Sequence, residues 1–120
     1  MPSFTRAIRP HVDAELHAAD SALANGRPDH AFVHLQRAHV LGQASTIEHV
    51  RVHVRMLRWG IAQRNLREIA GQLLRIVGAA TKTALGWVPH GNTGGADVSP
   101  FRRMPVPPDL DALIRRARGR

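Results

Sequence analysis

The sequence predicts an all-α protein: a four-helix antiparallel array of helical hairpins, followed by a Gly/Pro-rich arm and a short terminal helix. Apolar residues recur every three or four positions through residue 85, which is the period of an amphipathic helix. Prolines, glycines and capping residues mark the ends of each periodic segment. After Gly86 the periodicity ends, and proline and glycine become frequent. We therefore expect a single helical domain over residues 1–120.

The first two helices are expected over about residues 10–25 and 28–41. Each opens on a proline, Pro10 or Pro28, which suits the first helical position. Each is followed by a glycine, Gly26 or Gly42, which suits the residue after a helix end. Their apolar stripes are Val12, Leu16, Ala19 and Leu23 in the first helix, and Ala31, Leu35 and Ala38, widened by Phe32, in the second.

The third helix is expected over about residues 46–63, where Ser45 and Glu48 form a capping box. It carries two apolar stripes, so we expect neighbours on two sides and a central position in the fold. We also expect the second and third helices to be antiparallel, with Leu35 and Ala38 packed against the first of these stripes. The first stripe is Ile47, Val50, Val54, Leu57 and Ile61, and the second is Val52, Met56 and Trp59.

The fourth helix is expected over about residues 66–85, with Asn65 as its cap and Glu68 in its first turn. We expect its apolar stripe to be buried; the stripe is Leu66, Ile69, Leu73, Val77, Ala80 and Ala84. The arm over residues 87–108 holds too many apolar side chains for a free linker, so we expect it to lie across the helices with Trp87 and Phe101 buried. A last short helix is expected over about residues 109–118.

Composition excludes several classes of protein. The chain has no cysteine, which excludes disulfides, thiolate metal sites and cysteine nucleophiles. No run of about 18 uncharged apolar residues is present, so we expect no membrane span. Charge and proline come early in the N-terminal residues, which is atypical of a secretory signal, and we expect a cytoplasmic protein.

The chain is strongly basic, with a net charge of +8, and nearly all of the positive charge is arginine. Such a balance favours a phosphate-rich or acidic partner, but a genome-wide preference for arginine gives the same balance and is the favoured explanation. Arg51, Arg55 and Arg58 share one face of the third helix and could follow the phosphates of a nucleic acid. A row of charges is more often a solvated surface, so nucleic-acid binding is not favoured.

Eight histidines are the most unusual feature of the composition. His49 and His53 are four residues apart, a spacing that places two imidazoles on one helix face and is used for metal ligation. One interpretation is a zinc, nickel or copper site built from His34, His49 and His53. Further candidate ligands are His39, Glu15 and Glu48. The favoured interpretation is a set of core histidines that form hydrogen bonds with backbone carbonyls and with each other.

The segment from His90 to Gly95 is a second candidate binding site. Its glycines would let backbone amides approach an anion, and His90, Asn92 and Thr93 could add side-chain donors. No strand precedes it and no Gly-Lys-Ser/Thr follows it, so it is not a P-loop, and a tight turn is favoured. No catalytic motif is present elsewhere, which leaves enzymatic activity unsupported.

Two resemblances extend these observations. The segment LHAADSALANGRPDHAFVHLQRAHVL, residues 16–41, looks like a tetratricopeptide-type helical hairpin because small residues lie where two helices must approach. Nearly the whole chain resembles a family of short bacterial proteins of unknown function. The segments that carry this resemblance are HLQRAHVLGQ at 34–43, HVRVH at 49–53, MLRWG at 56–60, LLRIVGAATKTALGWVP at 73–89, GNTGG at 91–95 and MPVPPDL at 104–110. That family implies no activity and no catalytic residue.

Three functions therefore stay open. The leading one is a non-enzymatic interaction module that contacts a protein partner or a second copy of itself, which would require a large exposed apolar patch. The second is a histidine-based metal-binding or metal-accessory protein, which would require converging imidazoles. The third is a basic nucleic-acid binder.

Overall fold

The computed structural model describes residues 3–84, 92–96 and 103–119, and for residues 82–84 only the backbone. The described residues form helices joined by turns and irregular segments, as the sequence predicts. The helices are α1 (Ser3–Ala24), α2 (Pro28–Gly42), α3 (Thr46–Ala62), α4 (Leu66–Ala84) and α5 (Pro108–Ala117).

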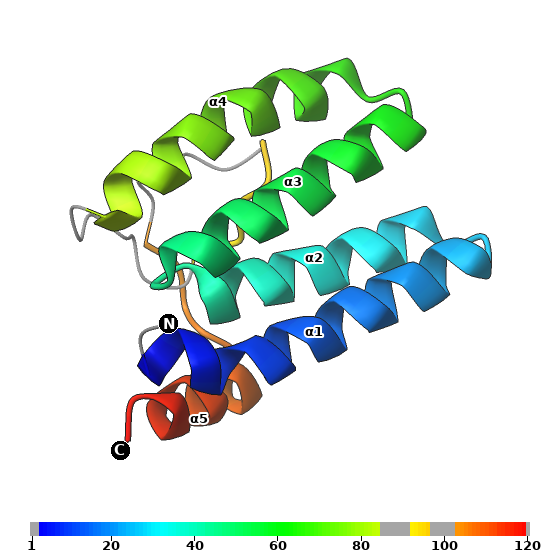
Figure 1. Ribbon diagram of the computed structural model, residues 1–120. Helices are drawn as coiled ribbons and strands as arrows, with labels where there is room; N and C mark the ends of the chain where they lie inside the picture. The colour runs from blue at the N-terminus through cyan, green and yellow to red at the C-terminus, as the bar shows by residue number, and fades with distance from the viewer. Residues whose placement is uncertain (1–2, 85–91, 97–102, 120) are drawn as a thin grey trace.

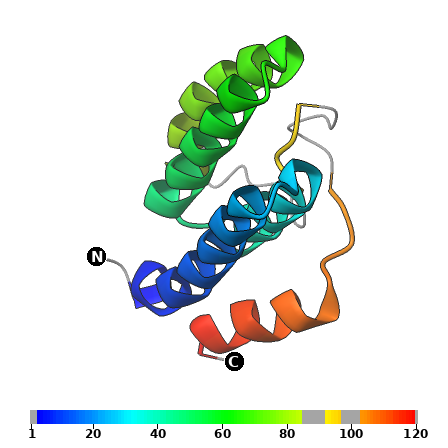
Figure 2. The ribbon, with the colours of Figure 1, turned by 90° about the vertical axis from the view of Figure 1, so that its right-hand side faces the viewer.

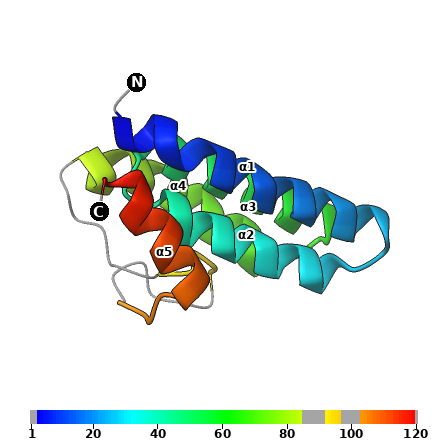
Figure 3. The same cartoon turned by 90° about the horizontal axis from the view of Figure 1, so that it is seen from below.

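The first four helices alternate in direction and lie in chain order, so that α1 and α2 form one hairpin and α3 and α4 another (Figure 1). Seen from the end, the two hairpins are stacked, with α4 on the outside of one and α5 beneath the other (Figure 2). The view from below shows α5 lying across α1 and α2 (Figure 3). Among the described helices, α4 packs on α3 alone.

The first helix begins seven residues earlier than the sequence predicts, and Pro10 lies inside it rather than at its start. An internal proline removes one backbone hydrogen bond and costs about 3 kcal/mol. The two turns that precede it bury Thr5 and Ile8, and Phe4 packs against the core from the same turns. This burial offsets the cost, so Pro10 is tolerated inside the helix rather than at the first helical position predicted for it.

The third helix turns its second apolar stripe toward the core. Val52 and Met56 are fully buried in one cluster with Leu35 and Ala38, and Trp59 extends this cluster toward the far end of the helix. Trp59 donates from Nε1 to the carbonyl of Pro28 at 2.8 Å. The expected contact through the first stripe is therefore wrong: its members Val50, Val54 and Leu57 are only partly buried, and Ile47 and Ile61 are exposed.

The fourth helix is rotated about its axis relative to the expectation. Of the stripe predicted to be buried, Leu66 is 79% exposed, Leu73 54% and Val77 68%. The buried side of α4 instead carries Glu68, Gln72 and Ala79. The prediction is wrong for these residues because the polar side chains on the other face have partners in α3 and in the arm, described below.

The described parts of the arm lie against the helices, as expected. Residues 92–96 form hydrogen bonds with side chains of α2 and α4, and Val106 packs against the core. The last helix adds Leu110 and Ile114 to the core and carries Asp109, which is ion-paired with Arg37 of α2. The expected burial of Trp87 and Phe101 concerns residues outside the described part of the chain. None of the described helices combines the length and hydropathy that a membrane span requires.

Candidate metal centre

The turn between α2 and α3 places residues near the end of α2 level with residues at the start of α3. Ser45 caps α3 by accepting a hydrogen bond from the Glu48 amide at 3.4 Å, and its hydroxyl lies 2.7 Å from that of Thr5. Gly42 permits the close approach, since a Cβ there would lie 3.0 Å from Cβ of Glu48. This tight connection brings His39 beside His49 and His53.

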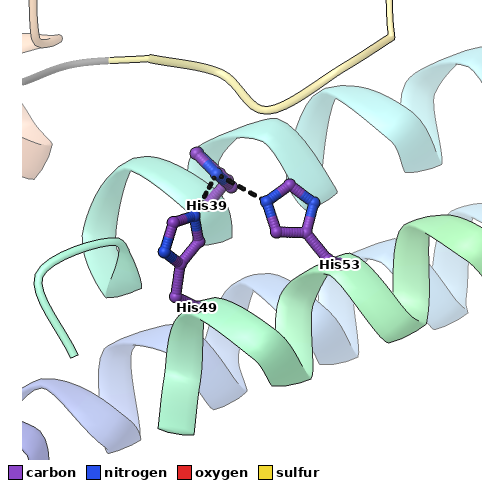
Figure 4. Close-up of side chains that lie close together, drawn as sticks. All are labelled: His39, His49 and His53. Atoms are coloured by element: carbon purple, nitrogen blue, oxygen red, sulfur yellow. Dashed lines mark hydrogen bonds between the residues drawn. The ribbon is translucent and has the colours of Figure 1, made fainter. Parts of the chain in front are cut away.

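These three histidines converge in the interior of the molecule (Figure 4). The Nε2 atom of His39 lies 3.0 Å from Nε2 of His49 and 3.1 Å from Nε2 of His53. Their relative exposures are 3%, 5% and 2%, so all three rings are removed from solvent. One ligand nitrogen from each ring can be chosen so that all three lie within 4.8 Å of one another.

A backbone carbonyl in the arm holds His39 in one tautomer. Its Nδ1 lies 2.6 Å from the carbonyl oxygen of Asn92, which can only accept, so Nδ1 carries the proton. Gly94 shapes the same loop: its φ is +82°, and a Cβ there would lie 2.4 Å from the His39 ring. A side chain at this position would therefore collide with the imidazole that the loop covers.

The tautomer of His53 is set by a polar network from α4. Its Nδ1 lies 2.5 Å from Oε1 of Gln72. The amide nitrogen of Gln72 donates to Glu68 at 2.6 Å and to the Gly94 carbonyl at 2.9 Å, which orients the amide oxygen toward His53. Glu68 in turn accepts from the Ala96 amide at 3.0 Å. The Nδ1 of His53 is thus the donor. The buried carboxylate of Glu68 is connected to it through Gln72.

These hydrogen bonds have an electronic consequence at the centre of the cluster. In neutral His39 and His53, a proton on Nδ1 leaves a lone pair on Nε2. The 3.1 Å contact between these Nε2 atoms therefore brings two lone pairs together. A proton on Nε2 of His49 can be donated to Nε2 of His39. When all three rings are neutral, no proton then remains for the second contact, between Nε2 of His39 and Nε2 of His53. A cation shared between the rings, either an additional proton or a metal ion, would relieve this contact.

Burial disfavours the proton. The pKa of His39 is well below its usual value of 6.5, because desolvation penalises the charged ring and because His53 and His49 would add like charge. A metal ion accepts lone pairs from several rings at once, and ligating histidines characteristically donate their other ring N–H to a carbonyl or carboxyl group. His39 and His53 have this arrangement.

The lowered pKa of His39 predicts how the metal-free protein responds to acid. Below about pH 6.5 the unfolded chain protonates His39 while the folded chain does not, so the unfolded state binds more protons. The free energy of unfolding therefore decreases as the pH is lowered. The slope attributable to one such group reaches about 1.4 kcal/mol per pH unit. Urea unfolding with chelator present, between pH 7.5 and 5, should show a steeper loss for the natural chain than for His39→Gln. Equal slopes for the two proteins would contradict this.

The structure separates His34 from His49 and His53 and pairs it with Glu15. Its Nδ1 lies 2.9 Å from Oε1 of Glu15 on α1, and the same carboxylate is ion-paired with Arg37 at 3.1 Å. Glu48, another candidate, is fully buried and forms an ion pair with Arg51 at 2.8 Å. Of the candidates, the structure therefore brings together His49, His53 and His39, and it places Glu15 with His34 instead.

The residues that support the cluster from outside were not identified from the sequence. Glu68 and Gln72 lie four residues apart on α4, and both are buried on the face opposite the apolar stripe. Two polar residues at this spacing indicate a shared helix face, but their burial depends on partners distant in sequence. The sequence predicts Asn92 as a side-chain donor of a binding loop, whereas in the structure it is 1% exposed and its side chain accepts from the Gly94 amide at 2.8 Å.

The other two candidate sites are engaged in internal contacts. Arg51 and Arg55 are ion-paired with Asp13 and Asp20 of α1, which lowers the charge this row offers to phosphates, while Arg58 is exposed. In the loop, the Thr93 hydroxyl lies 3.9 Å from the sulfur of Met104. His90 is outside the described residues.

Fold and site together define a small all-helical protein with a buried cluster of three histidines. A family model described as protein of unknown function, DUF3703, matches residues 6–114, and the chain therefore belongs to this family. The expected membership of an uncharacterised family is confirmed, and the matched range includes every residue of the cluster and of the network around it. No curated protein and no solved structure matches the chain.

Proposed function

We propose that this protein binds one transition-metal ion through the Nε2 atoms of His39, His49 and His53. The observation that carries the proposal is the 3.1 Å contact between Nε2 of His39 and Nε2 of His53, whose Nδ1 atoms both face acceptors. Without a shared cation this contact is repulsive. The histidine-based function, an alternative from the sequence, is therefore the one that the geometry supports best.

The spacing of the nitrogens fits such an ion. Bonds of about 2.0–2.1 Å to a tetrahedral centre separate two ligand nitrogens by about 3.3–3.4 Å. The two Nε2–Nε2 distances from His39, 3.0 and 3.1 Å, are slightly shorter than this. The three ligand nitrogens lie within 4.8 Å of one another, so the rings would shift to share one ion. Imidazole suits zinc, nickel and copper, and the ligand set does not choose among them.

The surroundings favour retention of the ion rather than free exchange with solvent. Gln72 and the Asn92 carbonyl orient two of the rings before binding, and the Glu68 carboxylate supplies negative charge through Gln72. The loop over residues 92–96 passes over His39 and hydrogen-bonds to both α2 and α4 (Figure 4). Entry and release of the ion would require this loop to move.

Calorimetric titration tests the proposal. The chain is purified without a histidine tag, stripped with chelator and titrated with zinc, nickel and copper at pH 7.5. We expect at least one of these metals to bind with one ion per chain and a Kd below about 10 μM. Native mass spectrometry of the same sample should show the mass of a single ion. If none of the three metals binds more tightly than about 10 μM, the rings form only a hydrogen-bonded core cluster and the proposal fails.

An interaction module, the leading function from the sequence, is also supported by one observation. Several large apolar side chains on the outer face of α4 are exposed, although their periodicity is that of a buried helix face. A metal-binding protein and an interaction module are compatible, because Glu68 and Gln72, which support the histidine cluster, lie on the face of α4 opposite the exposed one.

A further inference from the structure

The outer face of α4 carries a heptad pattern that the chain itself leaves uncovered. Apolar residues are spaced by four, three, four and three positions, which is the repeat of a coiled-coil seam. Every member of this seam is exposed; the seam is Leu66, Ala70, Leu73, Val77 and Ala80. The opposite face of the same helix packs on α3 and on residues 92–96. A second helix would therefore find a ready seam on the outside of the molecule.

We propose that this seam binds the same seam of a second copy of the chain, forming a two-fold dimer. The proposal is independent of the metal centre, whose contacts with α4 lie on the other side of the helix. An antiparallel pairing over residues 66–77 makes the seam self-complementary. It sets Leu73 of one copy opposite Ala70 of the other, and Leu66 opposite Val77, so that large side chains face smaller ones.

The charges along the seam favour a second copy over an acidic partner helix. Positions that flank a coiled-coil seam select the partner by charge. Here they are Ile69, Leu74, Ile76 and Thr81, with Arg67 the one charged residue among the flanking positions from 67 to 81. In the antiparallel pairing each Arg67 faces Leu74 of the other copy. The face thus meets itself without like-charge contacts, and Arg67 is the single basic flank that it offers to an acidic helix or a nucleic acid.

The size of the seam sets the expected strength. Leu66, Leu73, Leu74 and Val77 are exposed by 79%, 54%, 74% and 68%. With on the order of 100 Å² of apolar surface for each such side chain, and with the alanines, the face exposes about 400 Å². Two copies would together bury about 1,000 Å² when flanking atoms are included, which is near the lower limit of a specific interface. We therefore expect a dimer with a Kd in the micromolar range.

Sedimentation velocity of the full chain with chelator present tests this proposal. Between about 2 and 200 μM, the natural chain should pass from monomer to dimer. Leu73→Asp should remain largely monomeric up to about 200 μM, a loss of about 100-fold in affinity. Val33→Asp is the matched control, since Val33 is 49% exposed but lies on α2, and it should dimerise as the natural chain does. Leu66→Asp should repeat the loss, and an acidic residue suits the first turn of a helix, so this variant keeps its fold.

Salt distinguishes the apolar seam from an electrostatic contact. Each chain carries a net charge of +8, so raising sodium chloride from 50 to 500 mM screens the repulsion between copies and should strengthen the dimer. A natural chain that stays monomeric at 200 μM overturns the proposal. If that monomer sediments with anionic lipid vesicles, the apolar face binds a membrane surface instead of a second copy, and the proposal is equally overturned. A dimer that survives both aspartate substitutions on α4 also overturns it.

Discussion

His39→Ala should lower the affinity for the preferred metal by at least 100-fold, while His34→Ala should leave it unchanged. Loss of a group that only orients a ligand typically costs 10–100-fold in metal affinity, and loss of a ligand costs more. His39 is the residue that contacts both other rings, at 3.0 and 3.1 Å. His34 lies on the same helix but forms its hydrogen bond with Glu15 of α1. Calorimetric titration of the two variants gives the comparison.

The pair of variants distinguishes the proposed ligand set of His39, His49 and His53 from the set of His34, His49 and His53, which the sequence offers as one interpretation. Both substitutions remove one imidazole from α2, so a loss of weak surface binding would affect both equally. The far-ultraviolet circular dichroism of each variant establishes that its helices are intact. A larger loss of affinity with His34→Ala than with His39→Ala would contradict the proposed centre and favour the sequence-based set of His34, His49 and His53.

Metal should also raise the thermal unfolding midpoint of the chain by more than about 10 °C. The ligands come from two helices that only the folded chain brings together, so the ion binds the native state preferentially. At a free metal concentration 1,000-fold above Kd, this linkage contributes about 4 kcal/mol. For a domain of this size, each kcal/mol shifts the midpoint by several degrees. Differential scanning calorimetry with one metal and with chelator measures the shift.

The same scan on His39→Ala is the control for this linkage. Its midpoint with metal should differ from its midpoint with chelator by no more than a few degrees, whatever the stability of the variant itself. If the natural chain showed no shift, or if His39→Ala showed the same shift, the stabilisation would not come from the buried cluster.

Local sequence was sufficient to predict the helices but not their rotation. Prolines, glycines and caps place the ends of α2, α3 and α4 within a few residues, because these signals act on neighbouring backbone groups. Which face of α4 is buried depends instead on contacts distant in sequence. Gln72 is buried because His53 and the Gly94 carbonyl satisfy its amide, and this leaves the more apolar face outside. Hydrophobic periodicity predicts which residues share a helix face, but not whether another part of the chain buries that face.

The same limit explains the choice between His34 and His39. Because α2 and α3 run antiparallel from a turn near residue 43, His34 lies at the same height along the hairpin as His53, and His39 at the same height as His49. Height along the hairpin therefore makes both His34 and His39 candidate ligands. Five residues of helix rotate a side chain by about 140°, so only one of the two can face α3. The structure turns His39 toward α3 and His34 toward α1. His49 and His53 were correctly paired because a spacing of four fixes both on one face.

The tautomers and the metal bonds of the histidines can be observed together. Long-range proton–nitrogen correlation of the imidazole nitrogens, recorded before and after one equivalent of zinc, distinguishes protonated, bare and metal-bound nitrogen. We expect three of the eight histidines to acquire a zinc-bound Nε2, and His39 and His53 to carry the proton on Nδ1 in both states. Assignment follows from His39→Ala and His34→Ala spectra. Once calorimetry has established that zinc binds, a spectrum in which zinc shifts no Nε2 resonance, or shifts that of His34 instead of His39, would contradict the metal centre.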